Sequence, residues 1–118
     1  MDDIEKLAEI FKALSDPTRL RLVKLLADRA PGEVEPDECG GGPLCVNALA
    51  HRLGITQSAV SQHLRVLRQA RLVKGERRGA FVHYSLDQDG VRQVKAVLQE
   101  TLVETWEKRP PDPALPGA

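Results

Sequence analysis

The chain has 118 residues, 42% hydrophobic and 3% aromatic, so we expect one domain whose core is built mainly from aliphatic side chains. The sequence contains no run of about 18 apolar residues, the length that a membrane-spanning helix needs. The acidic start, Met1–Glu5, lacks the basic and apolar regions of a signal peptide, and two cysteines do not make a secreted disulfide scaffold. We therefore expect a cytoplasmic protein with no membrane partner.

The chain is neutral as a whole, with 17 basic and 17 acidic residues, but its charge is unevenly distributed. Residues 47–84 hold seven basic residues and one acidic residue, a net charge of +6. Residues 1–46 carry a net charge of −4 and residues 85–118 a net charge of −2. A basic patch on an otherwise acidic protein indicates a binding site for a polyanion.

Helical spacing of apolar residues predicts a first helix from about residue 3 to 14. Asp16 is a suitable N-cap and Pro17 a suitable first residue for a second helix, which fades near Arg29. Residues 30–43 contain four acids, prolines and three consecutive glycines, and they show no periodicity. This composition predicts a flexible acidic loop.

The next segment has the pattern of a helix-turn-helix. A short helix over residues 47–53 is followed by Gly54, which can adopt the left-handed conformation that ends a helix, and by Thr56, which can cap the next one. The second helix is predicted from about residue 57 to 70. It has an apolar face made of Val60, Leu64 and Leu67.

Hydrogen-bonding and basic side chains occupy the other face of this helix and a predicted β-hairpin whose two strands flank Glu76–Gly79. Such side chains read base edges and phosphates, so we expect the hairpin and helix to bind double-stranded DNA. A solvated helix face is the ordinary alternative, but the glycine turn and the basic hairpin favour DNA. The expected DNA contacts are Thr56, Gln57, Ser58, Ser61, Gln62, Arg65, Arg68, Lys74, Arg77 and Arg78.

The last predicted helix begins after the cap residue Asp87 and runs to about Lys108. The domain therefore spans residues 1–108, and the proline-rich tail 109–118 is expected to be disordered. The apolar stripes of the first and last helices either pack on the monomer's own core or form a two-fold homodimer. We favour the dimer, which would bind a near-palindromic operator.

The segment Phe11–Leu22, the segment Ser58–Leu67 and the hairpin segment Arg77–Tyr84 resemble the signatures of the arsenic- and zinc-sensing (ArsR/SmtB) repressors. The resemblance implies a mainly α winged helix-turn-helix with a small β-hairpin: four helices, the hairpin and a last helix. It also implies a homodimeric repressor that an inducer releases from DNA. Where the family has Ala-Gly-Leu, this chain has Ala70-Arg71-Leu72, so Arg71 either adds a phosphate contact or extends the helix. We find no arrangement typical of an enzyme.

The resemblance also suggests a sensor. Arsenic- and cadmium-responsive members begin the first helix of the motif with Cys-Val-Cys, where this chain has Cys45-Val46-Asn47. Cys39, across three glycines, could replace the missing thiol. The zinc- and nickel-type site on the last helix is not expected, because no histidine follows Tyr84.

A Cys39/Cys45 pair suits As(III), Cu(I) or Zn(II), or a reversible disulfide. A metal would need a further ligand. The alternative is that Cys39 has no role and Cys45 is a small buried apolar residue, which leaves a winged-helix regulator without a thiol sensor, controlled by a protein partner or by its abundance. A pure protein-interaction module is a third possibility, disfavoured by the basic patch.

The three histidines have structural interpretations. We expect His51 to point away from Cys45 and His63 to hold contacts between helices. His83 is expected to brace the hairpin or to touch a phosphate.

Overall fold

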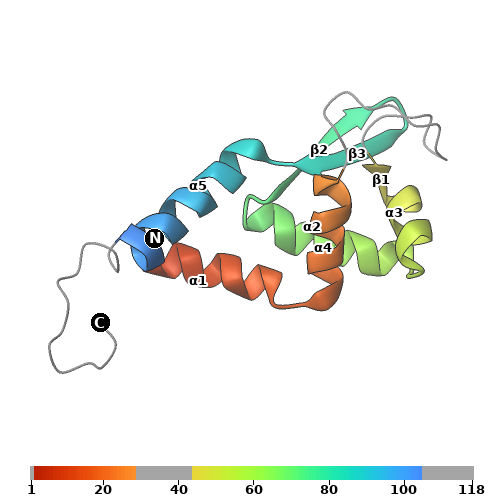
Figure 1. The fold of residues 1–118 in the computed structure, drawn as a ribbon. Helices are drawn as coiled ribbons and strands as arrows, with labels where there is room; N and C mark the ends of the chain where they lie inside the picture. The colour runs from red at the N-terminus through yellow and green to blue at the C-terminus, as the bar shows by residue number, and fades with distance from the viewer. Residues whose placement is uncertain (1, 29–43, 105–118) are drawn as a thin grey trace, which may run out of the picture.

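The computed structural model describes residues 2–28 and 44–104. It confirms the mainly helical fold, with a helix-turn-helix followed by a β-hairpin and a last helix (Figure 1). The predicted loop 30–43 and tail 109–118 lie outside the described residues. In chain order the elements are α1 (Asp3–Leu14), α2 (Pro17–Ala27), β1 (Leu44–Cys45), α3 (Val46–Leu53), α4 (Gln57–Gln69), β2 (Val73–Arg78), β3 (Phe81–Leu86), α5 (Gln88–Leu98) and the π-helix η1 (Gln99–Glu104).

Side-chain caps set the starts of the first two helices. The Asp2 carboxylate accepts a hydrogen bond of 2.7 Å from the backbone N–H of Glu5. Asp16 accepts from the backbone N–H groups of Thr18 and Arg19, at 2.8 and 3.1 Å. The bond from Arg19 is the main reason why the pKa of Asp16 lies below its ordinary value. The predicted cap at Asp16 is thus confirmed, and it separates α1 from α2.

The sheet has three strands in the order β1-β3-β2, all antiparallel, rather than the two expected. Strand β1 was missed because two residues are too short to show any periodicity. The predicted turn at Glu76–Gly79 was wrong in position, because pairing continues as far as Arg78 opposite Phe81. The strands are therefore joined by Gly79 and Ala80, and Glu76 to Arg78 belong to β2.

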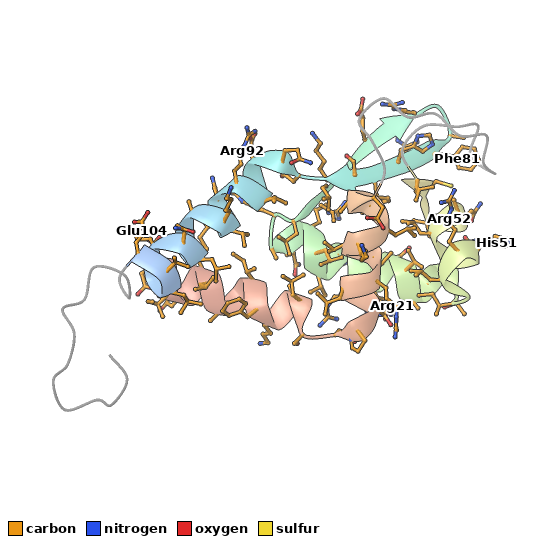
Figure 2. All side chains as sticks on the ribbon, in the orientation of Figure 1. Arg21, His51, Arg52, Phe81, Arg92 and Glu104 are labelled. Carbon is orange, nitrogen blue, oxygen red and sulfur yellow. The ribbon has the colours of Figure 1, made fainter. Side chains whose placement is uncertain are left out.

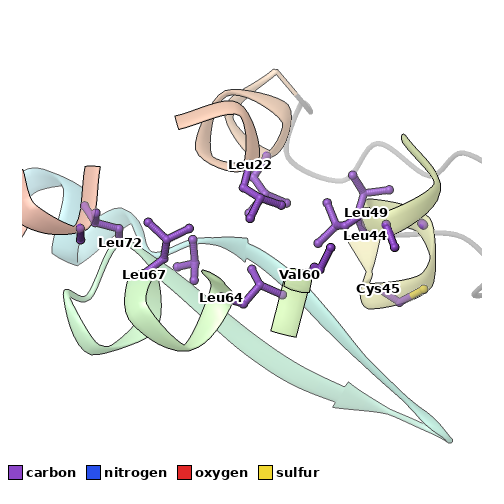
Figure 3. Close-up of a cluster of buried hydrophobic side chains, with 13 residues drawn as sticks. Leu22, Leu44, Cys45, Leu49, Val60, Leu64, Leu67 and Leu72 are labelled. Atoms are coloured by element: carbon purple, nitrogen blue, oxygen red, sulfur yellow. The ribbon is translucent and has the colours of Figure 1, made fainter. Parts of the chain in front are cut away.

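The core lies where α2, α3, β1 and the inner face of α4 meet (Figure 3). Its fully buried side chains are mostly leucines, and each contributes roughly 1.5–3 kcal/mol when it leaves water. The inner face of α4 is the predicted one, formed by Val60, Leu64 and Leu67, all at most 2% exposed. The core therefore holds α4 by one face only.

Helices α1 and α5 lie side by side at the end of the molecule away from α3 (Figure 1). The Lys6 ammonium donates a hydrogen bond of 3.2 Å to the side-chain carbonyl of Gln93, which joins the two helices. Asp87 caps α5 as predicted, by accepting from the backbone N–H of Gly90. The predicted end of this helix, at Lys108, lies outside the described residues. Among those residues, none of the helices is both long and apolar enough to cross a membrane.

Candidate nucleic-acid interface

The turn of the helix-turn-helix forms for the reasons that the sequence suggests. Gly54 adopts a left-handed conformation with a φ of 67°, which ends α3, and the backbone N–H of Ile55 bonds to the carbonyl of Ala50. The hydroxyl of Thr56 then accepts a hydrogen bond of 3.1 Å from the backbone N–H of Ala59. These bonds fix the angle at which α4 leaves α3.

All ten side chains predicted to contact DNA are exposed. Seven belong to the start and the outer face of α4, opposite the buried stripe that anchors this helix to the core. The remaining three belong to β2. The first seven are the N-cap residue Thr56 and, on α4, Gln57, Ser58, Ser61, Gln62, Arg65 and Arg68. Those on β2 are Lys74, Arg77 and Arg78.

The hairpin formed by β2 and β3 makes a basic wing beside α4. Only Val73 of β2 is buried, so the strand presents its basic side chains to solvent. The Arg78 guanidinium lies 3.8 Å from the Glu76 carboxylate, and both side chains are at least 50% exposed. Such a surface pair contributes at most about 1 kcal/mol, so Arg78 remains available to bind a phosphate. Arg77 precedes it on the opposite face of the strand.

Arg71 does not extend α4, which ends at Gln69 with Ala70 as its cap. Its φ is 61°, in the left-handed region that favours glycine. The interpretation that Arg71 extends the helix is therefore wrong. The side chain is exposed, and a phosphate contact stays a prediction.

His63 holds contacts between helices, as expected. Its Nδ1 lies 3.4 Å from a guanidinium nitrogen of Arg19, and Arg19 also donates a hydrogen bond of 2.6 Å to the carbonyl of Ala13. Arg19 therefore links the end of α1 to the middle of α4. His51 is exposed on α3, and Figure 2 shows it, with Arg52, at the outer edge of the fold.

The first of the two predicted sensor residues, Cys39, lies outside the described residues. Cys45 is 2% exposed and is disulfide-bonded. It ends β1 and is the N-cap residue of α3, without capping that helix through its side chain. Cys45 therefore adjoins α3, the helix that packs on α4, and it also belongs to β1, the strand that pairs with β3 of the wing.

The structure corrects part of the prediction for His83. It is 4% exposed, so the predicted contact with a phosphate is wrong; the expected role in bracing the hairpin is compatible with its place in β3. Neither of its ring nitrogens has a hydrogen-bond partner. It lies directly opposite Cys45 on β1, a relationship that was invisible while β1 itself was unrecognised. Within residues 2–28 and 44–104, no three potential metal ligands form a cluster.

The family described as bacterial regulatory protein, arsR family, matches residues 39–74. The chain is 41% identical to a transcriptional repressor SmtB homolog of Synechocystis sp., over 86% of this chain and 70% of that protein. It is 33% identical to the arsenic resistance transcriptional regulator ArsR1 of Pseudomonas putida, over 87% of this chain and 71% of that protein.

Among solved structures, one similar fold is the homodimeric winged helix-turn-helix DNA-binding domain Mb0332 of Mycobacterium bovis, studied by solution NMR. The identity is 27% and the TM-score 0.60, over 84% of this chain and 83% of that one.

The fold and these similarities define the class as winged helix-turn-helix DNA-binding proteins. Within that class, the chain belongs to the ArsR family of bacterial transcriptional regulators. Its activity is therefore DNA binding and not catalysis.

Proposed function

We propose that this chain is a homodimeric repressor that binds a near-palindromic operator and releases it when a thiophilic metal ion or metalloid, or a thiol oxidant, acts on Cys39 and Cys45. The observation that carries the DNA-binding part is the set of exposed polar and basic side chains on the outer face of α4 and on β2, two elements that contact each other. These side chains lie within the segment of net charge +6, while the rest of the chain is acidic. Counterion release from DNA then supplies affinity, and the polar residues of α4 supply specificity.

The position of Cys45 supports the sensing part. Cys45 is the N-cap residue of α3 and the β1 partner of β3. Because α3 packs on α4 and β3 forms the wing, a chemical change at this sulfur can act on both DNA-contacting elements. The chain's only other cysteine is Cys39, and the arsenic resistance regulator of P. putida is a relative. The disulfide-bonded state of Cys45 is consistent with oxidation as one form of signal.

The second candidate function is a regulator without a thiol sensor. The 2% exposure of Cys45 favours it, because a buried cysteine in an apolar core needs no role beyond packing. Control by a protein partner or by abundance would then replace the inducer.

The experiment that separates the two candidates measures operator affinity of the reduced protein against As(III), Cu(I), Zn(II) and a thiol oxidant. We expect the effective agent to weaken operator binding by about 1–3 kcal/mol, a usual size for allosteric coupling. Cys39→Ser and Cys45→Ser should each bind the operator like the parent and fail to respond.

Three outcomes would change this proposal. If Cys39→Ser responds like the parent, the pair does not act as a unit. If Cys45→Ser also responds, neither thiol is the sensor. If no agent alters the affinity of the parent protein, the sensorless regulator takes its place.

A further inference from the structure

A cavity of about 650 Å³ lies between α1 and the end of α4. This volume falls in the range of roughly 300–1,000 Å³ that is typical of sites for small organic ligands. Ile10, Ala13 and Val66 form an apolar part of its lining, and the first two are each 3% exposed. None of the lining residues is among the ten predicted DNA contacts, so the cavity is separate from the candidate DNA surface.

The polar part of the lining is basic. It has four cationic side chains and one carboxylate, that of Glu9, which gives a net charge of +3, whereas residues 1–46 as a whole are acidic. Within the part of the chain that the structure describes, the side chains of Lys12 and Arg71 have neither an ion pair nor a hydrogen bond. Cations gathered around a partly apolar cavity favour an anionic ligand. The four cationic residues are Lys6, Lys12, Arg19 and Arg71.

Arg19 is held at this cavity by the backbone of α1. Its Nε donates a hydrogen bond of 2.6 Å to the carbonyl of Ala13. One terminal nitrogen lies 3.4 Å from the carbonyl of Lys12, and the other lies 3.4 Å from Nδ1 of His63. A guanidinium has five N–H donors, so at least two remain for a ligand. These donors form a rigid fork that matches the geometry of a carboxylate.

We propose that this cavity binds a small organic acid, whose carboxylate pairs with Arg19 and whose apolar body packs against Ile10 and Val66. The proposal goes beyond the thiol sensor, because neither cysteine lines the cavity. The buried apolar contacts and the paired hydrogen bonds to Arg19 provide the affinity. The exposed side chains of Lys12 and Arg71 add electrostatic attraction for the anion.

The dimer expected for this chain leaves the cavity accessible. Ile4 and Phe11, which are 63% and 48% exposed, lie on one side of α1. Lys6, Ile10 and Ala13, which line the cavity, lie on the nearly opposite side, because each residue turns an α-helix by about 100°. A second copy that covers Ile4 and Phe11 therefore does not have to fill the cavity.

Arg19 also connects the cavity to α4. A carboxylate that draws the guanidinium away from His63 changes the contact between the end of α1 and the middle of α4. The bound acid then alters operator affinity, because it interacts differently with the two positions of Arg19.

The test titrates the full-length chain with benzoate and with benzamide, a neutral molecule of nearly the same shape, and follows the ¹⁵N signals by NMR. Benzoate should bind saturably and shift the Nε signal of Arg19 and the amide signals of Ala13 and Val66. Benzamide should bind at least about tenfold more weakly, because it lacks the charge that strengthens hydrogen bonds to a guanidinium. Operator affinity is measured with and without saturating benzoate.

Three variants test the lining. Lys12→Gln and Arg71→Gln should each weaken benzoate binding about threefold, as the loss of an exposed charge does. Arg19→Lys should weaken it about tenfold, because lysine keeps the charge but loses the fork. If Arg19→Lys does not fold, the first two variants decide. The matched control is Lys95→Gln, which removes an equal charge from an exposed position on α5 outside the lining and should bind benzoate like the parent.

The proposal is overturned if benzoate does not bind saturably, if benzamide binds equally well, or if the lining variants keep the parental affinity. Shifts confined to residues outside the cavity would also overturn it. If benzoate binds in the cavity and leaves operator affinity unchanged, the binding site stands and the connection through Arg19 is wrong. A failure of the thiol sensor leaves these results unaffected, because neither cysteine takes part in them.

Discussion

Arg71 occupies a backbone conformation that its side chain disfavours. A left-handed conformation costs a non-glycine residue roughly 1–2 kcal/mol, partly offset by the greater entropy that glycine loses on folding. We therefore expect Arg71→Gly to raise the free energy of unfolding by about 1 kcal/mol. Urea denaturation measures this. The matched control is Arg68→Gly, one turn earlier in α4, which should lower stability by about 1 kcal/mol. A loss of stability in both variants would contradict the backbone strain assigned to Arg71.

Gly90 packs so closely against the backbone of Arg71 that there is no room for a side chain at this position. A Cβ built on Gly90 would lie 1.6 Å from the carbonyl oxygen of Arg71, which is backbone and cannot rotate away. Gly90→Ala should therefore destabilise the fold, by about 1–3 kcal/mol, as overpacked substitutions do. Thermal unfolding against Lys95→Ala, an exposed position on the same helix, provides the comparison. A Gly90→Ala variant as stable as the parent would show that α5 does not pack against this carbonyl.

At the scale of elements, α4 and the wing are expected to contribute differently to DNA binding, α4 to base preference and the wing to overall affinity. Gln62 belongs to the exposed face of α4, and Arg77 belongs to β2 near the hairpin turn. Gln62→Ala should cost about 1–3 kcal/mol on operator DNA and relax base preference. Arg77→Ala should weaken binding to operator and random DNA alike and reduce the salt dependence.

Fluorescence anisotropy at several salt concentrations measures both effects. The control is Arg92→Ala, which removes an equal charge from α5, where Arg92 pairs with Asp89 at 2.7 Å. We expect it to leave both affinities nearly unchanged. If Arg77→Ala spares random DNA while Gln62→Ala weakens both equally, the assigned roles are reversed.

At the scale of the whole molecule, apolar side chains remain exposed on α1 and η1. Ile4 and Phe11 of α1 are 63% and 48% exposed, and Leu102 of η1 is 57% exposed. A homodimer that covers this surface would place two recognition helices on one face of DNA, with half-sites roughly 34 Å apart. The similar domain from M. bovis is described as homodimeric, and the dimer of this chain stays a prediction.

The double variant Phe11→Glu with Leu102→Glu should shift the protein toward monomer and weaken operator binding at least tenfold, because each monomer then binds one half-site alone. Analytical ultracentrifugation and footprinting measure the two effects. Leu20→Glu alters a comparably exposed apolar residue on α2 and serves as the control. A monomer that protects a single half-site as strongly as the parent protects its operator would refute the dimer.

The sequence by itself determined the helix-turn-helix and most helix starts, because these depend on residues close in the chain. Gly54 ends α3, Thr56 caps α4 and Asp16 caps α2, each through bonds that span at most four residues. The exposure of the ten predicted DNA contacts was also predictable. The apolar stripe of α4 can only face the core, which leaves the opposite face to solvent.

The tertiary structure alone decided what depends on residues far apart in the chain. Helix propensity predicts that Gly90→Ala stabilises α5, and only the carbonyl of Arg71, brought there by folding, reverses the sign. In the same way, the sequence left open whether His83 braces the hairpin or touches a phosphate, and only the folded chain shows that it is buried. A two-residue strand carries no periodic signal, so only its partner strand reveals it and places Cys45 opposite a buried imidazole.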